Sequence, residues 1–159
     1  MNRDASFEDG AERPLRLKAE GAEDVTVLSS LAQDAVFPMA EIAWKPSRRR
    51  FALLLNRFRW EDLPAAERRG RDFERVRAVL AFDDVTKVSS SGLDRSDPDI
   101  VLSLLSITWE PLEDGAGRFE LTLAGDGAIA LEAECVNVIL QDVTRPYIAP
   151  SRKAPKHPE

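Results

Sequence analysis

One sequence pattern occurs twice in the chain. Residues 42–46 read Ile-Ala-Trp-Lys-Pro and lead into Arg-Phe-Ala-Leu-Leu-Leu at 50–55. Residues 107–111 read Ile-Thr-Trp-Glu-Pro and lead into Arg-Phe-Glu-Leu-Thr-Leu at 118–123. Each copy joins two apolar, strand-like segments through a polar turn, which is the pattern of a β-hairpin. Because tryptophan is a rare residue, the repetition predicts an equivalent hairpin in each half of the fold.

Alternation of apolar and polar residues predicts further strands. The most informative one covers residues 51–60, where both faces are apolar at the start, so this strand should lie in the centre of a sheet. Arg57 and Arg59 are expected to emerge into solvent as the strand leaves the core. Other strands are predicted at residues 15–19, 36–44 and 76–88, the last with a bend at Asp83 and Asp84 and a turn after it at residues 89–92.

Two helices are predicted beside these strands. Apolar residues at spacings of three and four predict a helix over residues 22–35, with Glu23 and Asp24 in its first turn, where the helix dipole favours acidic side chains. Asp97 and Pro98 are typical of a helix start. They predict a second, short helix that continues with Ile100, Val101, Leu104 and Leu105.

The last hairpin has a predicted register. A three-residue loop at 125–127, with Gly127 in the left-handed conformation, keeps the apolar side chains of both strands on one face, whereas a two-residue loop would mix the faces. The strand at 128–134 is also rich in helix formers, so a helix there stays an alternative. The predicted opposite pairs are Leu123 with Ile129, Leu121 with Leu131, Phe119 with Ala133, Thr122 with Ala130, Glu120 with Glu132, and Arg118 with Glu134.

These elements predict a single α+β domain over residues 14–144. It should contain about seven or eight mainly antiparallel strands, arranged as a barrel or a sandwich, and two helices. The repeated hairpin predicts two related halves, at about 14–90 and 91–144. A disordered tail is expected at 1–13 and a Pro-rich, basic tail at 145–159.

The composition favours a soluble protein of the cytoplasm. A chain of 159 residues suits one domain, and its apolar runs are shorter than the roughly 18 residues of a membrane span. Residues 1–13 are polar and acidic, unlike a signal peptide. Cys135 is the single cysteine, which excludes an intrachain disulfide.

Charge is unevenly distributed. The chain as a whole carries a net charge of −6, but residues 45–77 hold eleven basic and five acidic side chains. Arginine next to aromatic residues suits contacts with phosphates and bases. A binding site is therefore predicted at Arg48, Arg49, Arg50, Arg57, Arg59 and Trp60.

Catalytic equipment is sparse. His157 is the only histidine and lies in the predicted tail, away from any residue that could orient it, so a nucleophile–histidine site is not expected. Cys135 has acidic neighbours and is expected to be a buried structural thiol. Residues 125–130 match a weak dinucleotide-binding pattern but are better explained as a hairpin loop. No catalytic residue, metal ligand or cofactor is predicted.

Acidic residues leave one alternative open. Glu120, Glu132 and Glu134 are expected on one face of the sheet, and a carboxylate cluster could serve acid–base chemistry or hold a hard metal ion. Such a site requires the three carboxylates to converge in a pocket. Asp94, Asp97 and Asp99 cluster where helix capping explains them.

Several stretches resemble a known family. They are residues 33–36, 50–61, 75–82, 124–129 and the pair Glu134-Cys135. The chain resembles a small alphaproteobacterial family defined as domain of unknown function 2948, over about residues 14–150. The resemblance implies a bacterial, cytoplasmic setting, and it implies no catalytic or binding residues.

The function expected from these observations is a non-catalytic binding or adaptor module that acts through a protein partner. The alternatives are binding of nucleic acid or another polyanion through residues 45–77, and a carboxylate-based enzyme or metal site at Glu120, Glu132 and Glu134. No membrane association is expected.

Overall fold

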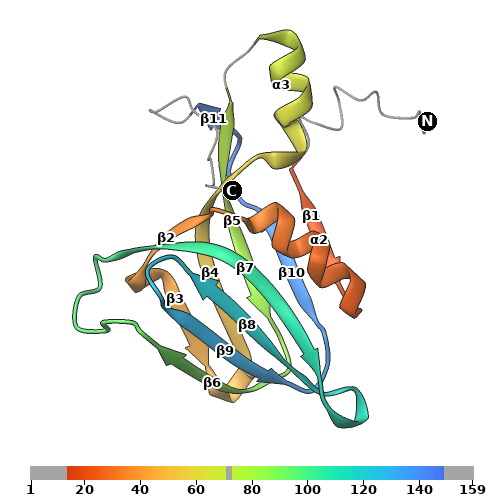
Figure 1. Cartoon of the computed structure of the whole chain (residues 1–159), viewed down its shortest axis with the longest axis vertical. Coiled ribbons are helices and arrows are strands. Elements are labelled where there is room, and N and C mark those ends of the chain that lie inside the picture. Colours follow the sequence, from red (N-terminus) through yellow and green to blue (C-terminus); the bar gives the residue numbers. More distant parts are fainter. Residues whose placement is uncertain (1–13, 71–72, 149–159) are drawn as a thin grey trace.

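A computed structural model describes residues 14–70 and 73–148 of the protein. In this part of the chain, eleven strands form one curled sheet in the order β1-β10-β5-β4-β2-β7-β8-β9-β6, with β3 beside β4 and β11 beside β5 (Figure 1). All of its pairings are antiparallel. The strands are β1 (Arg16–Ala19), β2 (Val36–Pro38), β3 (Ile42–Lys45), β4 (Arg50–Phe58), β5 (Glu74–Phe82), β6 (Val85–Ser91), β7 (Val101–Pro111), β8 (Gly117–Leu123), β9 (Ala128–Ala133), β10 (Val138–Asp142) and β11 (Tyr147–Ile148).

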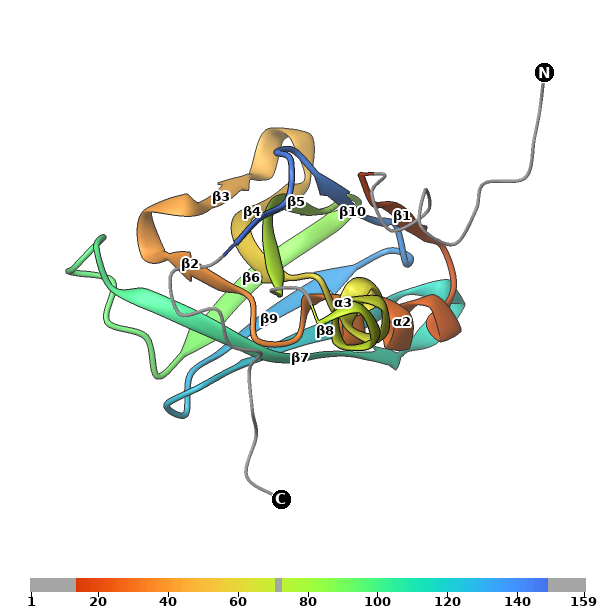
Figure 2. The same ribbon diagram turned by 90° about the horizontal axis from the view of Figure 1, so that it is seen from above.

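The curl folds the sheet into two layers around one core. Seen from above, β1, β10, β5, β4 and β3 form one layer, and β6, β9, β8 and β7 form the other (Figure 2). The three-residue strand β2 joins the layers, because it pairs with β4 on one side and with β7 on the other. The core between them contains Phe51, Leu53, Leu80, Phe82, Phe119, Leu121 and Leu131. The α+β class is confirmed, and the strands are more numerous and shorter than predicted.

The first predicted helix is present as α2 (Ala22–Ala32). Asp24 stabilises its start, because one carboxylate oxygen accepts hydrogen bonds from the backbone N–H groups of Glu20 and Gly21. The buried face consists of Val25, Leu28 and Ala32. The helix ends three residues earlier than predicted, and residues 36–38 already belong to β2.

The second predicted helix, over residues 98–105, is wrong: the chain forms the long strand β7 here. Leu102 and Leu104 are buried while Val101 is exposed and Ser103 is half-buried, so the operative spacing is two and not three to four. The second helix lies instead at α3 (Leu63–Arg69), between β4 and β5. Gly70 ends α3 in the left-handed conformation, at φ 65°.

Two predicted strand boundaries change. The strand predicted at 36–44 is divided by the short 3₁₀ helix η1 (Met39–Glu41), which separates β2 from β3. The turn predicted at 89–92 is wrong for its three serines, which continue β6 to Ser91. The bend at Asp83 and Asp84 is confirmed: Asp84 has a φ of 60°, and the chain passes there from β5 in one layer to β6 in the other.

The last hairpin keeps its predicted faces but has another register. Residues 128–133 form strand β9, and Leu121 pairs with Ile129 rather than with Leu131. The backbone N–H of Leu123 donates to the carbonyl of Gly127, so the loop is 124–126, with Gly125 and Asp126 in the left-handed region. Moving the loop by one residue moves the pairing by two, which preserves the face of every side chain.

The two repeated segments both form hairpins, as predicted. Trp44 on β3 lies opposite Phe51 on β4, and Trp109 on β7 lies opposite Phe119 on β8. An ancestral duplication that would explain this likeness stays a hypothesis. Among the described residues, no helix is both long and apolar enough to cross a membrane.

The predicted tails lie largely outside the described residues. This applies to residues 1–13, to 149–159 and therefore to His157. Within the segment 145–159, which was predicted to be a tail, Tyr147 and Ile148 form β11 and pair with Glu74 and Arg75 of β5.

Candidate functional site

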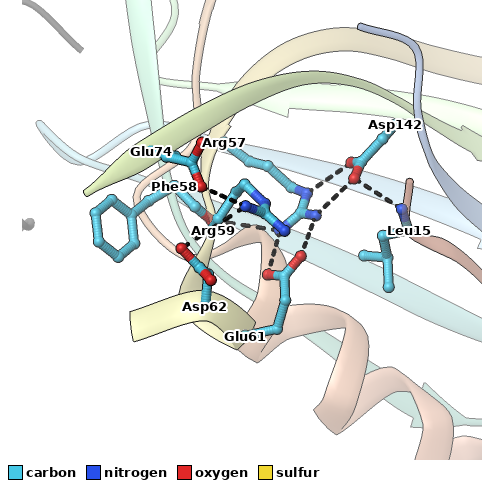
Figure 3. A network of polar contacts seen from close by, with 8 residues as sticks. All are labelled: Leu15, Arg57, Phe58, Arg59, Glu61, Asp62, Glu74 and Asp142. Carbon is cyan, nitrogen blue, oxygen red and sulfur yellow. Dashed lines mark hydrogen bonds and ion pairs between the residues drawn. The ribbon is translucent and has the colours of Figure 1, made fainter. Parts of the chain in front are cut away.

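Arg57 lies inside the protein and not on a binding surface. Its side chain has no solvent exposure, so the expectation that it emerges from the core is wrong. Figure 3 shows its guanidinium between two carboxylates. Nε and Nη2 donate to Asp142 at 3.0 Å each, while Nη1 and Nη2 donate to Glu61 at 2.9 and 2.7 Å. Two bidentate ion pairs therefore use every edge of this guanidinium.

Arg59 is also buried, with 3% of its side chain exposed. Its Nη1 donates to Glu74 at 2.6 Å and lies 3.7 Å from a carboxylate oxygen of Asp62. Asp142, the partner of Arg57, also accepts a hydrogen bond from the backbone N–H of Leu15 at 2.8 Å. This ion-pair network thus joins β4, β5, β10, the 3₁₀ helix η3 (Trp60–Asp62) and the segment before β1.

The electrostatics of the ion-pair network favour its charged forms. Burial acts to raise the pKa of Glu61, but the hydrogen bonds and charge of Arg57 outweigh it and leave this pKa below the ordinary value. Burial likewise acts to lower the pKa of Arg57, and its two carboxylate partners leave it raised. Arg57 and Glu61 are therefore charged at neutral pH and support the fold as an ion pair, whereas Nε and Nη2 of Arg59 are buried without a hydrogen-bond partner among the described residues.

The arginine-rich turn at the end of β3 is partly paired with acidic residues. Arg50 donates through Nε and Nη2 to Asp83 at 2.7 and 3.1 Å, and Arg49 forms an ion pair with Glu134. Arg48 is exposed and makes no ion pair with another described residue. The structure therefore brings Arg48, Arg49 and Arg50 together and separates them from Arg57 and Arg59.

Trp60, the last of the predicted binding residues, is half-buried beside α2. Its indole Nε1 donates to the carbonyl of Gln33 at 2.9 Å. Its ring packs edge-on against Phe58, with 4.7 Å between centroids. Both contacts are structural, because they fix η3 against the end of α2 and the end of β4.

The three predicted carboxylates do not converge. Glu120 is exposed on β8, Glu132 lies opposite Arg118 and 3.9 Å from Lys87, and Glu134 pairs with Arg49. Within residues 14–70 and 73–148, no group of three or more acidic, histidine or cysteine side chains has an arrangement that could hold a metal ion. The hypothesis of a carboxylate site finds no support in this spread along the sheet.

Cys135 is half-buried and lies near the bend between β5 and β6. Its thiol donates to Asp84 at 3.4 Å, and the amide of Asn137 donates to the same carboxylate oxygen at 3.0 Å. Burial, followed by the contact with Asp84, raises the pKa of the thiol. A raised pKa disfavours the thiolate, so this cysteine is poorly suited to nucleophilic chemistry.

The structure contains an apolar pocket that the sequence patterns do not predict. It has a volume of about 270 Å³ and lies between the facing edges of β3 and β6. Most of the wall is aliphatic or aromatic, and the polar residues are one serine and one arginine. The lining residues are Met39, Ile42, Trp44, Phe51, Val88, Ser90, Leu93, Arg95 and Ile129.

The pocket exists because the curled sheet does not close. β6 pairs with β9 alone and β3 pairs with β4 alone, so the two strands face each other without a ladder between them. The gap is bridged at one end, where the N–H of Val85 donates to the carbonyl of Arg49. The other end lies near η1, where the N–H of Met39 donates to the carbonyl of Ile100. Between these joints the layers diverge and expose apolar side chains.

Arg95 gives the pocket a charged rim. It lies in the loop between β6 and β7, and its Nη2 donates to the hydroxyl of Ser90 at 2.5 Å. The neighbouring Asp94 is occupied by its own turn, because its carboxylate accepts hydrogen bonds from the backbone and the hydroxyl of Ser96. The pocket can therefore take an apolar group with a negative charge beside it.

The sequence did contain traces of this pocket. The pattern places Trp44 in a hairpin, but the exposure of its ring depends on the position of β6, which begins 41 residues further along the chain. Ser89, Ser90 and Ser91 look like a turn, and only the pairing with β9 shows that they form an edge strand. A run of small polar residues directly after Val88 was the one local indication of an edge.

Comparison with known protein families identifies a match that covers most of the chain. A family model described as "Protein of unknown function (DUF2948)" matches residues 15–157. No curated protein and no solved structure matches the chain.

Proposed function

The chain belongs to the DUF2948 family of proteins of unknown function, and on that premise we propose that it is a non-catalytic binding module that acts through a protein partner. The pocket between β3 and β6 is the observation that carries the proposal. It receives one large apolar side chain of the partner, next to the positive charge of Arg95.

The size of the pocket favours a side chain over a metabolite. At about 270 Å³ it lies below the roughly 300–1,000 Å³ of sites that enclose small molecules. Its wall has the composition of an interface core, since Trp44, Phe51 and Met39 belong to residue types that are enriched where proteins meet. A shallow aromatic and methionine-lined hollow is suited to anchoring a partner.

The arrangement of charges supports binding without catalysis. The buried arginines, Arg57 and Arg59, are paired in the ion-pair network. Ser90, the hydroxyl in the pocket, accepts from Arg95, a group that cannot act as a base. A lone hydroxyl beside a guanidinium orients a bound group and does not attack it.

The cytoplasm is part of the same proposal, and so is a bacterial source. Cys135 is the only cysteine, and a domain without disulfides suits a reducing compartment. Polyanion binding through Arg48, Arg49 and Arg50 stays a weaker alternative, because two of these three guanidinium groups already have carboxylate partners. It predicts affinity that falls steeply with salt.

Peptide selection tests the proposal. The full chain is immobilised and panned with a phage-displayed library of random dodecapeptides, and the strongest binder is synthesised and titrated by calorimetry. Leu93→Glu places a carboxylate in the pocket wall and should weaken binding about tenfold or more. Leu112→Glu is the matched control, since Leu112 is 54% exposed in a loop outside the pocket lining and should leave the affinity unchanged.

Two results would contradict the proposed function. One is a selection that yields no peptide with a measurable affinity for the folded protein. The other is a selected peptide that binds Leu93→Glu and Leu112→Glu equally well, which would place its contacts away from the pocket.

A further inference from the structure

Building on the proposed function, we propose that the partner binds by strand addition: an extended segment pairs with the free edge of β6, inserts an apolar side chain into the pocket, and places an acidic residue against Arg95. The pocket accounts only for the apolar side chain of the partner. The backbone of β6 and the charge of Arg95 define the extended backbone and the acidic residue next to that side chain.

The edge of β6 is open along most of its length. Its ladder with β9 uses one side, with opposite pairs from Lys87–Glu132 to Ser91–Ala128. On the other side, the contact with the first layer is the hydrogen bond from Val85 to Arg49. Beyond it, no backbone hydrogen bond connects Val88 or Ser90 with another described residue across this edge. Unpaired backbone groups in a row are a template for another strand.

The register identifies which groups are free. The N–H of Leu123 donates to Gly127 at the loop, so Leu123 and Gly127 form a bonded pair. Bonded pairs alternate along an antiparallel ladder, and the odd-numbered residues of β9 therefore bond to β8 and its even-numbered residues to β6. Ala130 lies opposite Ser89, which assigns Ser89 to the ladder. Val88 and Ser90 consequently direct their N–H and C=O groups toward the open edge.

The same two residues line the pocket. Val88 and Ser90 are two positions apart, so their side chains share one face of β6, and both belong to the pocket wall. A strand added along this edge continues the pleat of the sheet. Every second side chain of that strand then points toward Trp44 and Ile129, and one of them fills the pocket. Val88 and Ser90 thus offer backbone hydrogen bonds to an added strand at the same position where the pocket receives one of its side chains.

Arg95 specifies the charge of the added segment. It is the one charged side chain among the described residues that line the pocket. One of its five N–H donors is engaged by Ser90, which holds the guanidinium at the end of β6 and leaves a fork for a carboxylate. The nearby acids Asp94 and Asp97 accept hydrogen bonds within their own turns, from Ser96 and from the backbone N–H of Asp99, and among the described residues neither forms an ion pair with Arg95.

Proline at position 90 isolates the backbone donor. Ser90→Pro removes the outward N–H without disturbing a ladder bond to β9, since proline is tolerated where the N–H of an edge strand faces solvent. Ser90→Ala removes the hydroxyl but keeps this donor. In calorimetric titrations with the selected peptide, Ser90→Pro should bind about tenfold or more weakly than Ser90→Ala, because both variants lack the hydroxyl and only the proline also lacks the N–H.

Ser89→Pro tests the assigned register. Its N–H belongs to the ladder, so this variant should melt well below Ser90→Pro in circular dichroism. If the two prolines destabilise equally, or if Ser89→Pro is the milder, the free edge has been assigned to the wrong residues and the proposal is overturned. A selected peptide that binds Ser90→Pro as tightly as the unchanged protein also overturns it.

The acidic residue is tested from both sides of the contact. Replacing the acidic residue of the selected peptide by its amide should cost about tenfold against the unchanged protein and little against Arg95→Gln. Equal losses against both proteins overturn the assignment to Arg95. The two proposals fail separately: loss of binding in Leu93→Glu with full binding in Ser90→Pro keeps the pocket and removes strand addition.

Discussion

The two tryptophan hairpins share a pattern and end in different surroundings. In the β7–β8 hairpin, the ring of Trp109 packs over the partner strand β8. Its centroid lies 4.6 Å from the ring centroid of Phe119, and its six-membered ring covers Gly117. In the β3–β4 hairpin, Trp44 also lies opposite Phe51, but its ring lines the open pocket. The repeated pattern therefore determines the pairing of each hairpin, and the neighbouring strands determine whether its tryptophan is covered.

The hairpins also differ at their far ends. β4 extends six residues beyond Phe51 to Arg57, which enters the buried ion-pair network. Six residues beyond Phe119, the chain has Gly125 and turns back into β9. The β3–β4 hairpin ends in the buried ion-pair network, and its Trp44 borders the open pocket. The β7–β8 hairpin ends in the turn to β9, and its Trp109 packs against Phe119.

Removing the charged anchor should have the largest effect on stability. Arg57→Met leaves Asp142 buried without its cation, and breaking a buried pair in this way costs about 3–5 kcal/mol. Arg118→Met is the matched control on the other hairpin, because Arg118 is exposed on β8, and it should cost less than about 1 kcal/mol. Urea denaturation measures both. Equal losses would mean that the ends of the two hairpins contribute alike.

The tryptophans should separate stability from binding. Trp109→Ala removes a ring packed on Phe119 and should cost about 3 kcal/mol. Trp44→Ala should cost about half as much, because one face of its ring borders the pocket, yet it should abolish binding of the selected peptide. Thermal melts and calorimetric titrations of both variants test this. Peptide binding that depends on Trp109 and ignores Trp44 would reverse the comparison.

Glycine is what allows the second hairpin to close. A methyl group at position 117 would lie 2.3 Å from the ring of Trp109 and 2.6 Å from the carbonyl oxygen of Glu110, so the backbone must shift. Gly117→Ala should therefore cost about 2 kcal/mol. Gly21→Ala, which meets only the movable carboxylate of Glu23 at 3.3 Å, should cost less than 1 kcal/mol by the same denaturation assay. If Gly117→Ala left the free energy of unfolding unchanged, the ring of Trp109 would be as free to move as the ring of Trp44.

Low pH should weaken the ion pair between Glu61 and Arg57 at the end of β4. The folded-state pKa of Glu61 lies below its ordinary value of 4.5, so the stabilisation by Glu61 is complete above that pH and is lost as the pH falls through the folded pKa. The free energy of unfolding should decline below pH 4.5, and Glu61→Gln should remove part of this decline. Urea denaturation between pH 6 and the acid transition measures the slope. An identical slope in the variant would exclude Glu61 as a contributor.

The smallest effect is expected at the arginine-rich turn. Arg50 pairs with Asp83, but half of its side chain is exposed, and pairs of this kind contribute about 0.2–1 kcal/mol. Arg50→Ala should thus change the free energy of unfolding by less than 1 kcal/mol and leave peptide binding intact. A double-mutant cycle with Asp83→Ala checks the pair. A larger coupling would make this turn a second charged anchor.

The sequence predicted the features of the fold that depend on local periodicity. Helix α2 followed from its apolar spacing, and the central position of β4 followed from its two apolar faces. It misled at β7, where Asp97 and Pro98 look like a helix start. There Asp97 caps a turn with Asp99, and the period-two burial of the strand begins only afterwards.

Local sequence patterns could not predict the candidate site. The pocket combines residues from 39–44, 88–95 and position 129, and their proximity depends on how far the sheet curls. Arg57 shows the same limit. Two nearby arginines after an apolar segment look like the solvent-exposed end of a strand. The carboxylate that pairs with Arg57 in the interior belongs to Asp142, 85 residues away in the sequence.

The pairing of β1 with β10 has a consequence for the order in which the chain folds. Residues 16–19 bond to 138–141, and Arg57 finds Asp142 only when the strand after Asn137 is available. A nascent chain that ends before β10 has its first-layer strand β5 uncovered along one edge and a strongly solvated guanidinium at the end of β4. Contacts of such sequence separation slow folding. We expect the first layer to complete its structure late, after the β7–β8–β9 meander, whose strands are neighbours in sequence, has already formed.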